Sequence, residues 1–136
     1  MTFLTKQNAT VLLTFLALTP QLGLACLCTS LDLDESYAYA DYVVVANLMS
    51  AEILDGTFSK GVFEVSEILK GNPPKLLKLK TRYQTGHTCG VIYWVGASYV
   101  LFLESTQEVI SSCSGNGPMS LRKDVFEWYV NRENAE

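Results

Sequence analysis

The sequence predicts a mainly β fold: a small OB-fold barrel of five or six strands, with a short N-terminal helix and a C-terminal helix. The first observation is a series of short apolar and β-branched runs, each separated from the next by turn-forming residues. The second is a change to helical spacing near the C-terminus. The third is the length of 136 residues, which suits one domain, and closing so small a sheet into a barrel removes its exposed edges.

The strands are expected where apolar runs lie between chain breaks. Asp55-Gly56 is a turn dipeptide, and Lys70–Pro74 interrupts any regular structure. The run that begins at Tyr42 is continuous and β-branched, so we expect it to be buried on both faces. The six expected strands are Tyr42–Leu48, Gly61–Leu69, Leu76–Thr81, Cys89–Val95, Ser98–Leu103 and Glu108–Cys113.

Two helices are expected to flank the strands. Ser30 or Asp32 is a suitable N-cap for a short helix that reaches Ala40, because acidic residues follow in its first turn. Apolar residues then recur at helical spacing over Ser120–Asn131, with Ser120 as the expected N-cap.

Composition and charge exclude several classes of function. Fourteen Asp and Glu against ten Lys and Arg give a net charge of −4, so the chain lacks the basic character of a nucleic-acid-binding protein. Its one histidine, His87, lies in a polar loop and is expected to be solvated. With a single histidine and no Gly-rich phosphate loop, the sequence presents no catalytic constellation. We therefore expect no enzymatic activity and no cofactor.

The first 25 residues have the three-part pattern of a secretory signal peptide. Lys6 precedes the apolar run Val11–Leu18, Pro20 ends the run, and Gly23-Leu24-Ala25 places small residues before a cleavage site. The run is shorter than the roughly 20 residues that span a bilayer. We expect residues 1–25 to be removed, leaving 26–136 as one secreted domain, extracellular or periplasmic, with no transmembrane segment. A buried N-terminal helix is the alternative.

Four cysteines follow the expected cleavage site: Cys26, Cys28, Cys89 and Cys113. An exported domain of this size is expected to form two disulfides. A Cys26–Cys28 bond would close a very small, strained ring, so each should pair separately with Cys89 or Cys113, in either combination. Each bond would contribute roughly 3–5 kcal/mol to stability. The alternative is a C-x-C thiolate site for a soft metal ion.

A set of short motifs occurs in order along the chain, starting at the expected cleavage site: Cys26-Leu27-Cys28, Ala40–Ala46, Phe63-Glu64-Val65, Leu69-Lys70-Gly71, Cys89-Gly90, Gly96–Phe102 and Ile110–Cys113. Together they resemble the tissue inhibitors of metalloproteinases (TIMPs) and the wider netrin-like module, as a minimal single-domain member. The resemblance implies an OB fold with a helix packed on it. It also implies the disulfides Cys26–Cys89 and Cys28–Cys113.

In the inhibitors that this chain resembles, the N-terminal cysteine binds the zinc of the target protease. The resemblance implies that the α-amino group and carbonyl oxygen of Cys26 chelate the catalytic zinc of a metalloendopeptidase. Leu27 would enter the specificity pocket, and Cys28, Thr29 and Ser30 would lie along the cleft. A catalytic zinc keeps an open position, and an α-amine with a pKa of about 7.7–8.0 deprotonates readily at neutral pH. The protein would hold no metal of its own.

Two alternatives use the same fold. In a non-inhibitory netrin-like binding module, Cys26 and Cys28 would serve only as structural cross-links. In a lipoprotein, a lipid anchor on Cys26 would acylate the amine and prevent chelation of zinc.

For two further groups of residues we prefer a structural role to a catalytic or ligand-binding one. Asp32, Asp34 and Glu35 stand at the start of the first helix, where capping and dipole interactions are expected rather than acid–base catalysis or Ca²⁺ binding. Aromatic residues on two expected strands are assigned to the core rather than to stacking on nucleic-acid bases: Tyr93, Trp94, Tyr99 and Phe102.

Overall fold

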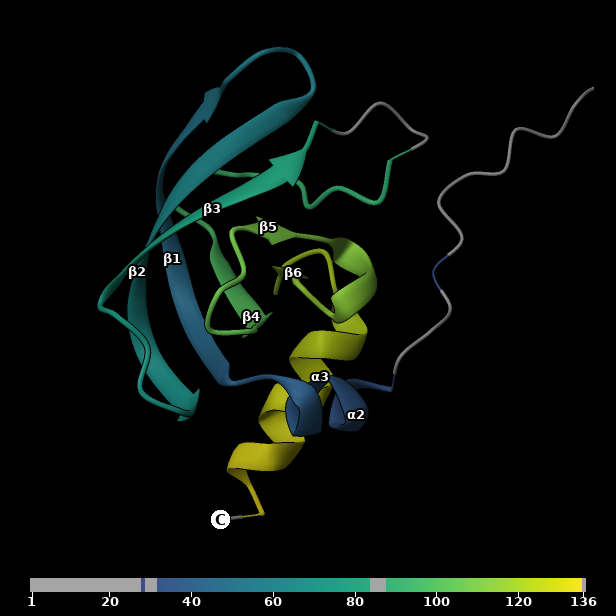
Figure 1. Cartoon of the computed structure of the whole chain (residues 1–136). Coiled ribbons are helices and arrows are strands. Elements are labelled where there is room, and N and C mark those ends of the chain that lie inside the picture. The colour runs from purple at the N-terminus through teal and green to yellow at the C-terminus, as the bar shows by residue number, and fades with distance from the viewer. Residues whose placement is uncertain (1–27, 29–31, 84–87, 136) are drawn as a thin grey trace, which may run out of the picture.

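The architecture comes from a computed structural model that describes residues 28, 32–83 and 88–135. Within these residues, one curled sheet of six strands is flanked by two α-helices that lie together at one end (Figure 1). The expected mainly β fold is confirmed, and the sheet has the half-barrel form of an OB-like barrel. In chain order the elements are α2 (Leu33–Tyr39), β1 (Tyr42–Ile53), β2 (Phe58–Lys70), β3 (Leu76–Arg82), β4 (Ser98–Leu103), β5 (Val109–Ile110), the 3-10 helix η1 (Ser112–Ser114), β6 (Gly117–Pro118) and α3 (Lys123–Glu133).

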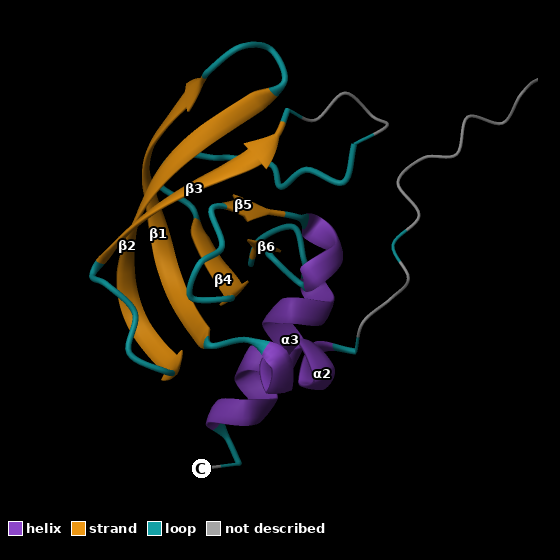
Figure 2. Ribbon diagram, viewed as in Figure 1, coloured by secondary structure: helices purple, strands orange, loops and turns teal. Residues whose placement is uncertain are grey.

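The sheet is organised around the long strand β1 (Figure 2). The strand order is β5-β3-β2-β1-β4-β6. β1 pairs with β2 over Val43–Ile53 but with β4 only over Tyr42–Asn47. Register shifts interrupt the β1–β2 ladder at three places, and such bulges bend and twist a sheet. The sheet therefore curls, and the second half of β1 extends beyond β4.

The first half of β1 is buried on both faces, as its continuous apolar sequence predicted. Val43 packs beneath the helices and Val44 packs inside the curl, and neither is exposed to solvent. The cluster inside the curl is Val44, Ala46, Leu48, Phe63, Leu77, Leu79, Val91, Tyr99, Leu101, Leu103 and Ile110. The cluster beneath the helices is Ala40, Val43, Val100, Phe102 and Val125.

Polar and aromatic contacts also fix the helices to the sheet. The Tyr37 hydroxyl donates to the Leu69 carbonyl oxygen at 3.0 Å, and the Lys70 ammonium donates to the Tyr37 carbonyl oxygen at 2.8 Å. The Arg132 Cζ atom lies 3.6 Å from the centroid of the Tyr37 ring, and the Trp128 ring lies 5.8 Å from it. These contacts join α2, α3 and the end of β2 into one packed unit.

The segment Cys89–Val95 is not the strand that its sequence predicted. Several of its backbone groups bond to side chains of neighbouring strands, and its backbone bonds to Ser112 and Ala97 form no strand ladder. The Val91 N–H donates to Thr81 Oγ1 at 2.7 Å, and the Trp94 N–H donates to the Tyr99 hydroxyl oxygen at 2.7 Å. The segment is therefore irregular, although Val91 is buried as a strand residue would be.

Two other boundaries also differ from expectation. The expected strand Glu108–Cys113 contains only the two residues of β5 before η1 begins. The C-terminal helix starts at Lys123 rather than after Ser120, because the intervening backbone forms a turn closed on the Pro118 carbonyl oxygen.

The assignment of four aromatic residues to the core is correct in part. Tyr99 and Phe102 are buried, and Tyr93 is half-buried with its hydroxyl donating to the Leu79 carbonyl oxygen at 3.0 Å. Trp94, in contrast, is 51% exposed, because the irregular segment that carries it turns outward before β4.

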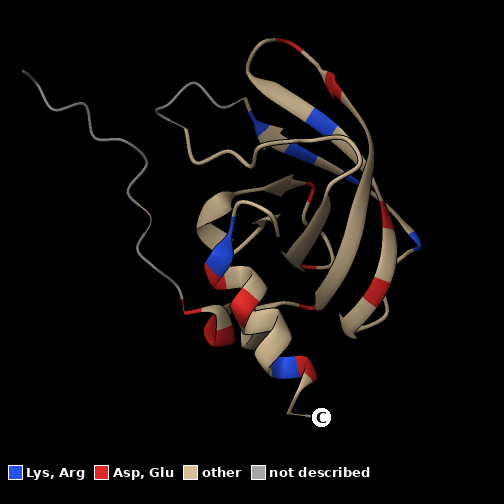
Figure 3. Ribbon diagram, turned by 180° about the vertical axis from the view of Figure 1, so that it is seen from behind, with Lys and Arg blue, Asp and Glu red and all other residues tan. Residues whose placement is uncertain are grey.

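Charged residues of both signs are distributed over the strands and helices (Figure 3). On the outer face of the sheet they form exposed ion pairs with N–O distances of 3.6 to 3.8 Å, which are Lys60–Glu52, Lys75–Glu64 and Lys80–Glu108. Exposed pairs of this kind contribute at most about 1 kcal/mol each. They keep the surface locally balanced in charge.

Candidate functional site

Most of the predicted site residues lie outside the described part of the chain. Cys26, Leu27, Thr29 and Ser30 belong to this group, and so does the expected Cys26–Cys89 disulfide. Cys28 is described, and it is exposed at the surface. The part of the candidate site that can be built from described residues is therefore Cys28 and the residues that hold it.

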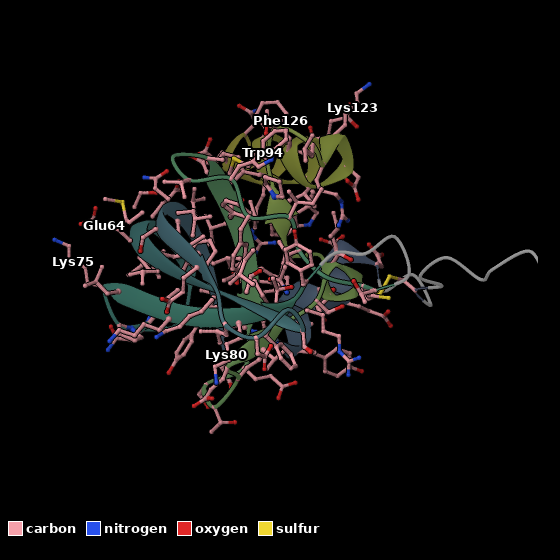
Figure 4. The ribbon with its side chains drawn as sticks, turned by 90° about the horizontal axis from the view of Figure 1, so that it is seen from above. Glu64, Lys75, Lys80, Trp94, Lys123 and Phe126 are labelled. Atoms are coloured by element: carbon pink, nitrogen blue, oxygen red, sulfur yellow. A yellow bond between two sulfur atoms is a disulfide. The ribbon has the colours of Figure 1, made fainter. Side chains whose placement is uncertain are left out.

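A disulfide joins Cys28 to Cys113, with an S–S distance of 2.01 Å and a Cα–Cα distance of 5.2 Å. The Cα separation is usual for a disulfide. This is one of the pairings that the cysteine count left open and the one that the resemblance implied. Figure 4 draws a disulfide as a yellow bond between two sulfur atoms. The bond ties the chain, two residues after the expected cleavage site, to the segment that follows β5.

A third sulfur atom lies beside this disulfide. The Sγ atoms of Cys28, Cys89 and Cys113 are all within 4.8 Å of one another, and we call these three residues the cysteine cluster. Cys89 is itself disulfide-bonded. Residues that are more than 60 positions apart in the sequence therefore meet at one point of the surface.

Serine side chains and backbone groups position two members of the cluster. The Cys89 carbonyl oxygen accepts hydrogen bonds from the Ser112 N–H at 3.0 Å and from the Ser111 hydroxyl at 3.0 Å. Ser111 Oγ in turn accepts from the Cys113 N–H at 3.1 Å and caps η1. Gly115 ends η1 with a φ of +82°, a conformation that favours glycine. Local sequence chemistry thus holds Cys89 and Cys113 side by side.

Two buried polar residues that the sequence analysis missed support this region. The Asn116 side chain accepts from the Phe102 N–H at 2.8 Å and donates to the Ser111 carbonyl oxygen at 3.1 Å. Thr81 donates from its hydroxyl to the Ile110 carbonyl oxygen at 3.2 Å. Asn116 stands between two glycines in an apparent turn, and Thr81 ends an alternating strand, so neither position looks buried in the sequence.

A shallow apolar hollow of about 140 Å³ adjoins the cluster. Two of its residues, Ile92 and Leu121, are 36% and 47% exposed, so they offer apolar surface to a partner. Gly90 forms one wall, and a Cβ atom there would collide with the Arg82 carbonyl oxygen, which explains glycine after Cys89. The hollow is lined by Gly90, Val91, Ile92, Ser112, Asn116, Gly117, Pro118, Leu121 and Arg122.

An ion pair borders the hollow. The Arg122 Nη2 atom lies 2.8 Å from Asp124 Oδ2, and Nη1 donates to the Ser112 carbonyl oxygen at 3.2 Å. The hydrogen bonds between the two side chains raise the pKa of Arg122 and lower that of Asp124. Arg122 therefore connects η1, with its cysteine, to the start of α3.

The acidic residues near the N-terminus have structural roles. Asp32 is the N-cap of α2, and its Oδ1 atom accepts from the Asp34 N–H at 3.3 Å. Asp34 accepts from the indole N–H of Trp128 at 2.8 Å. The capping interpretation is confirmed for Asp32. Across the described residues, the cysteine cluster is the one group of three or more potential metal ligands.

His87 lies outside the described residues, so its expected solvation stays a prediction. Within the described ranges, no helix has the length and apolar character that crossing a bilayer requires. No protein-family model matches the chain, and no curated protein sequence matches it significantly.

Proposed function

We propose that the mature protein is a secreted, TIMP-like inhibitor of a zinc metalloendopeptidase and that Cys26 chelates the catalytic zinc of the target. The observation that carries this proposal is the Cys28–Cys113 disulfide, which anchors the chain two residues after the expected mature N-terminus. Cys28 is exposed, so the point of attachment lies at the surface.

Anchoring matters because a backbone chelator must be ordered to bind tightly. A free N-terminal dipeptide loses much of its freedom on binding, whereas one attached to a cross-linked residue loses less. The chemistry also fits, since a catalytic zinc accepts nitrogen and oxygen ligands at its open position. The disulfide therefore supports chelation by Cys26 without forming any bond to the metal.

The hollow beside the cysteine cluster would add contact surface to that of the short N-terminal segment. Ile92 and Leu121 expose apolar side chains there, and the lining includes Ser112, which precedes Cys113 in η1. Specific interfaces bury about 800 Å² on each partner, which the N-terminal segment alone does not supply. We infer that the wall of the target's cleft contacts this hollow while Leu27 enters the specificity pocket.

The decisive experiment compares N-termini. The mature chain that starts at Cys26 is prepared alongside one with a single extra N-terminal alanine, and both are tested against zinc endopeptidases. We expect the extension to weaken inhibition at least about 100-fold, equivalent to about 2.7 kcal/mol, because it removes the α-amine from the metal. Equal inhibition by the two forms would exclude chelation by Cys26.

The side chain after the chelator gives a second test. Leu27→Gly should weaken inhibition by about tenfold to 100-fold, because burying a leucine contributes about 1.5–3 kcal/mol. Val95→Gly is the matched control, since Val95 is an exposed apolar residue outside the hollow and should leave inhibition unchanged. An unchanged inhibition constant for Leu27→Gly would show that this side chain enters no pocket.

The second candidate function is a non-inhibitory extracytoplasmic binding module. The same module with a lipid anchor on Cys26 is a lipoprotein. A second groove, of about 380 Å³, favours this function as a candidate binding surface. Its lining includes Ile92, which also lines the hollow, and it extends to Ile53 and Tyr83 beside the ends of β1 and β3. Mass spectrometry of the exported protein distinguishes the lipoprotein, whose Cys26 is acylated. A free Cys26 amine without inhibition of any zinc endopeptidase would favour the binding module.

A further inference from the structure

Besides its place in the proposed inhibitor, the cysteine cluster gathers three potential metal ligands at one point. The sequence alone offers a C-x-C pair, Cys26 and Cys28, with no further ligand nearby in the chain. The fold supplies those ligands, because it brings Cys89 and Cys113 to Cys28 with all three Sγ atoms within 4.8 Å of one another.

We propose that the reduced chain binds one thiophilic metal ion, of the class of Zn²⁺, through the thiolates of Cys28, Cys89 and Cys113. Zn–S bonds of about 2.3 Å at tetrahedral angles place two sulfur atoms about 3.8 Å apart. Once reduced, the Cys28 and Cys113 sulfur atoms, 2.01 Å apart in the disulfide, must separate by about 1.8 Å, and the pairs with Cys89, which lie within 4.8 Å, must close by at most about 1 Å. The inference does not depend on whether Cys26 inhibits a protease.

The chemistry requires a reductant, for which we name a dithiol. One dithiol transfers two electrons and two protons to the Cys28–Cys113 bond, which breaks into two thiols while the dithiol closes its own disulfide. A second dithiol does the same for the bond of Cys89. Metal binding then displaces the three thiol protons, because thiolate is the ligand form.

The fold keeps two ligands close together without any disulfide. The Ser112 N–H and the Ser111 hydroxyl both bond to the Cys89 carbonyl oxygen at 3.0 Å, and the Cys113 N–H bonds to Ser111 Oγ. None of these bonds involves sulfur, so reduction does not itself break them.

The third ligand, Cys28, is joined to α2 by only a few residues. Cys28 is four residues before Asp32, the N-cap of α2. Tyr37 and Lys70 join α2 to the end of β2 through hydrogen bonds. The short connection to a fixed helix limits how far Cys28 can move after reduction. All three thiolates thus stay within reach of one ion.

The test uses the mature chain with Cys26→Ser, in which only the three cluster cysteines remain. The chain is reduced with a phosphine, which is oxidised to its oxide as each S–S bond gains two electrons, and is then titrated with Cd²⁺. We expect one Cd²⁺ per chain and an ultraviolet sulfur-to-metal charge-transfer band. A chain loaded first with Zn²⁺, which gives no such band, should develop the same band as Cd²⁺ displaces Zn²⁺, because thiolates prefer the softer ion. Unreduced wild-type protein should show no band.

Variants establish which residues bind. Cys89→Ser and Cys113→Ser should each weaken Cd²⁺ binding by about tenfold or more, because even the loss of an outer-shell partner costs about 10- to 100-fold. Ser114→Ala, which changes a neighbour in η1 that carries no ligand atom, should bind as before. Absence of the band, or an unchanged affinity after Cys113→Ser, would overturn the proposal.

The contribution of the fold is tested separately. If the reduced chain stays folded, its affinity should exceed that of the same chain in denaturant, and equal affinities would overturn the proposal. If reduction unfolds it, Cd²⁺ should restore the far-ultraviolet circular dichroism of the oxidised protein. A chain that stays unfolded at saturating Cd²⁺ would contradict a site built by this fold.

Discussion

The two halves of β1 have opposite environments. Where β2 and β4 both flank the strand, Val43, Val44 and Ala46 are fully buried, because the helices cover one face and the curled sheet covers the other. In the arm Met49–Ile53, which pairs with β2 alone, Ile53 is 61% exposed. The comparison teaches that packing stability is concentrated in the first half, while the arm presents apolar surface that a partner can use.

The largest expected effect tests this contrast on a single strand. Leu48→Ala should lower the free energy of unfolding by about 2–5 kcal/mol, because it leaves a cavity in the cluster inside the curl. Ile53→Ala, on the same strand, should change it by no more than about 0.5 kcal/mol. Urea unfolding of both variants gives the comparison. Similar losses for the two would show that the arm is packed in solution.

A smaller effect is expected from the polar support behind the cysteine cluster. Asn116→Ala leaves the buried Phe102 N–H without its acceptor, and we expect a loss of about 1–3 kcal/mol in unfolding free energy. Asn134→Ala is the matched control, because that side chain bonds only at the exposed end of α3. A loss at Asn116 no greater than at Asn134 would mean that solvent replaces the lost bond.

The smallest effect belongs to the ion pair at the start of α3. The pKa of Asp124 is lowered from its ordinary value of 3.8, so the pair stabilises the fold above that pH and loses its contribution as the pH falls through the folded value. Asp124→Asn should cost at most about 1 kcal/mol at neutral pH, since the pair is partly exposed. The difference from wild type, followed by urea unfolding, should vanish in acid. A difference that persisted there would assign the effect to packing.

The wrong strand prediction for Cys89–Val95 shows where a sequence pattern does not determine local structure. Cys89–Val95 has the composition of a strand, but the Tyr99 hydroxyl accepts from the Trp94 N–H and donates to the Ile92 carbonyl oxygen. Side chains of β3 and β4 thus bond to part of its backbone, and the apolar pattern of the segment does not record their position. The strand prediction for the arm was wrong in the opposite sense. Met49–Ile53 lacks a strand pattern but becomes part of β1 through pairing with β2.

The candidate site could be predicted only in part. The sequence placed four cysteines after an expected cleavage site, and the resemblance pointed to the Cys28–Cys113 pair. It did not reveal the hollow beside the cluster, because Ile92 and Leu121 come from separate segments. Asn116 was missed for a related reason, since its burial depends on packing against β4 and η1.

The sequence by itself determined the mainly β class, the two helices and the buried half of β1, because apolar periodicity and capping residues act over a few neighbouring positions. Only the tertiary structure decided that Cys28, Cys89 and Cys113 meet at one point, that Trp94 faces solvent and that Asn116 is buried. These outcomes depend on contacts between residues far apart in the chain, and such contacts arise only when the sheet curls.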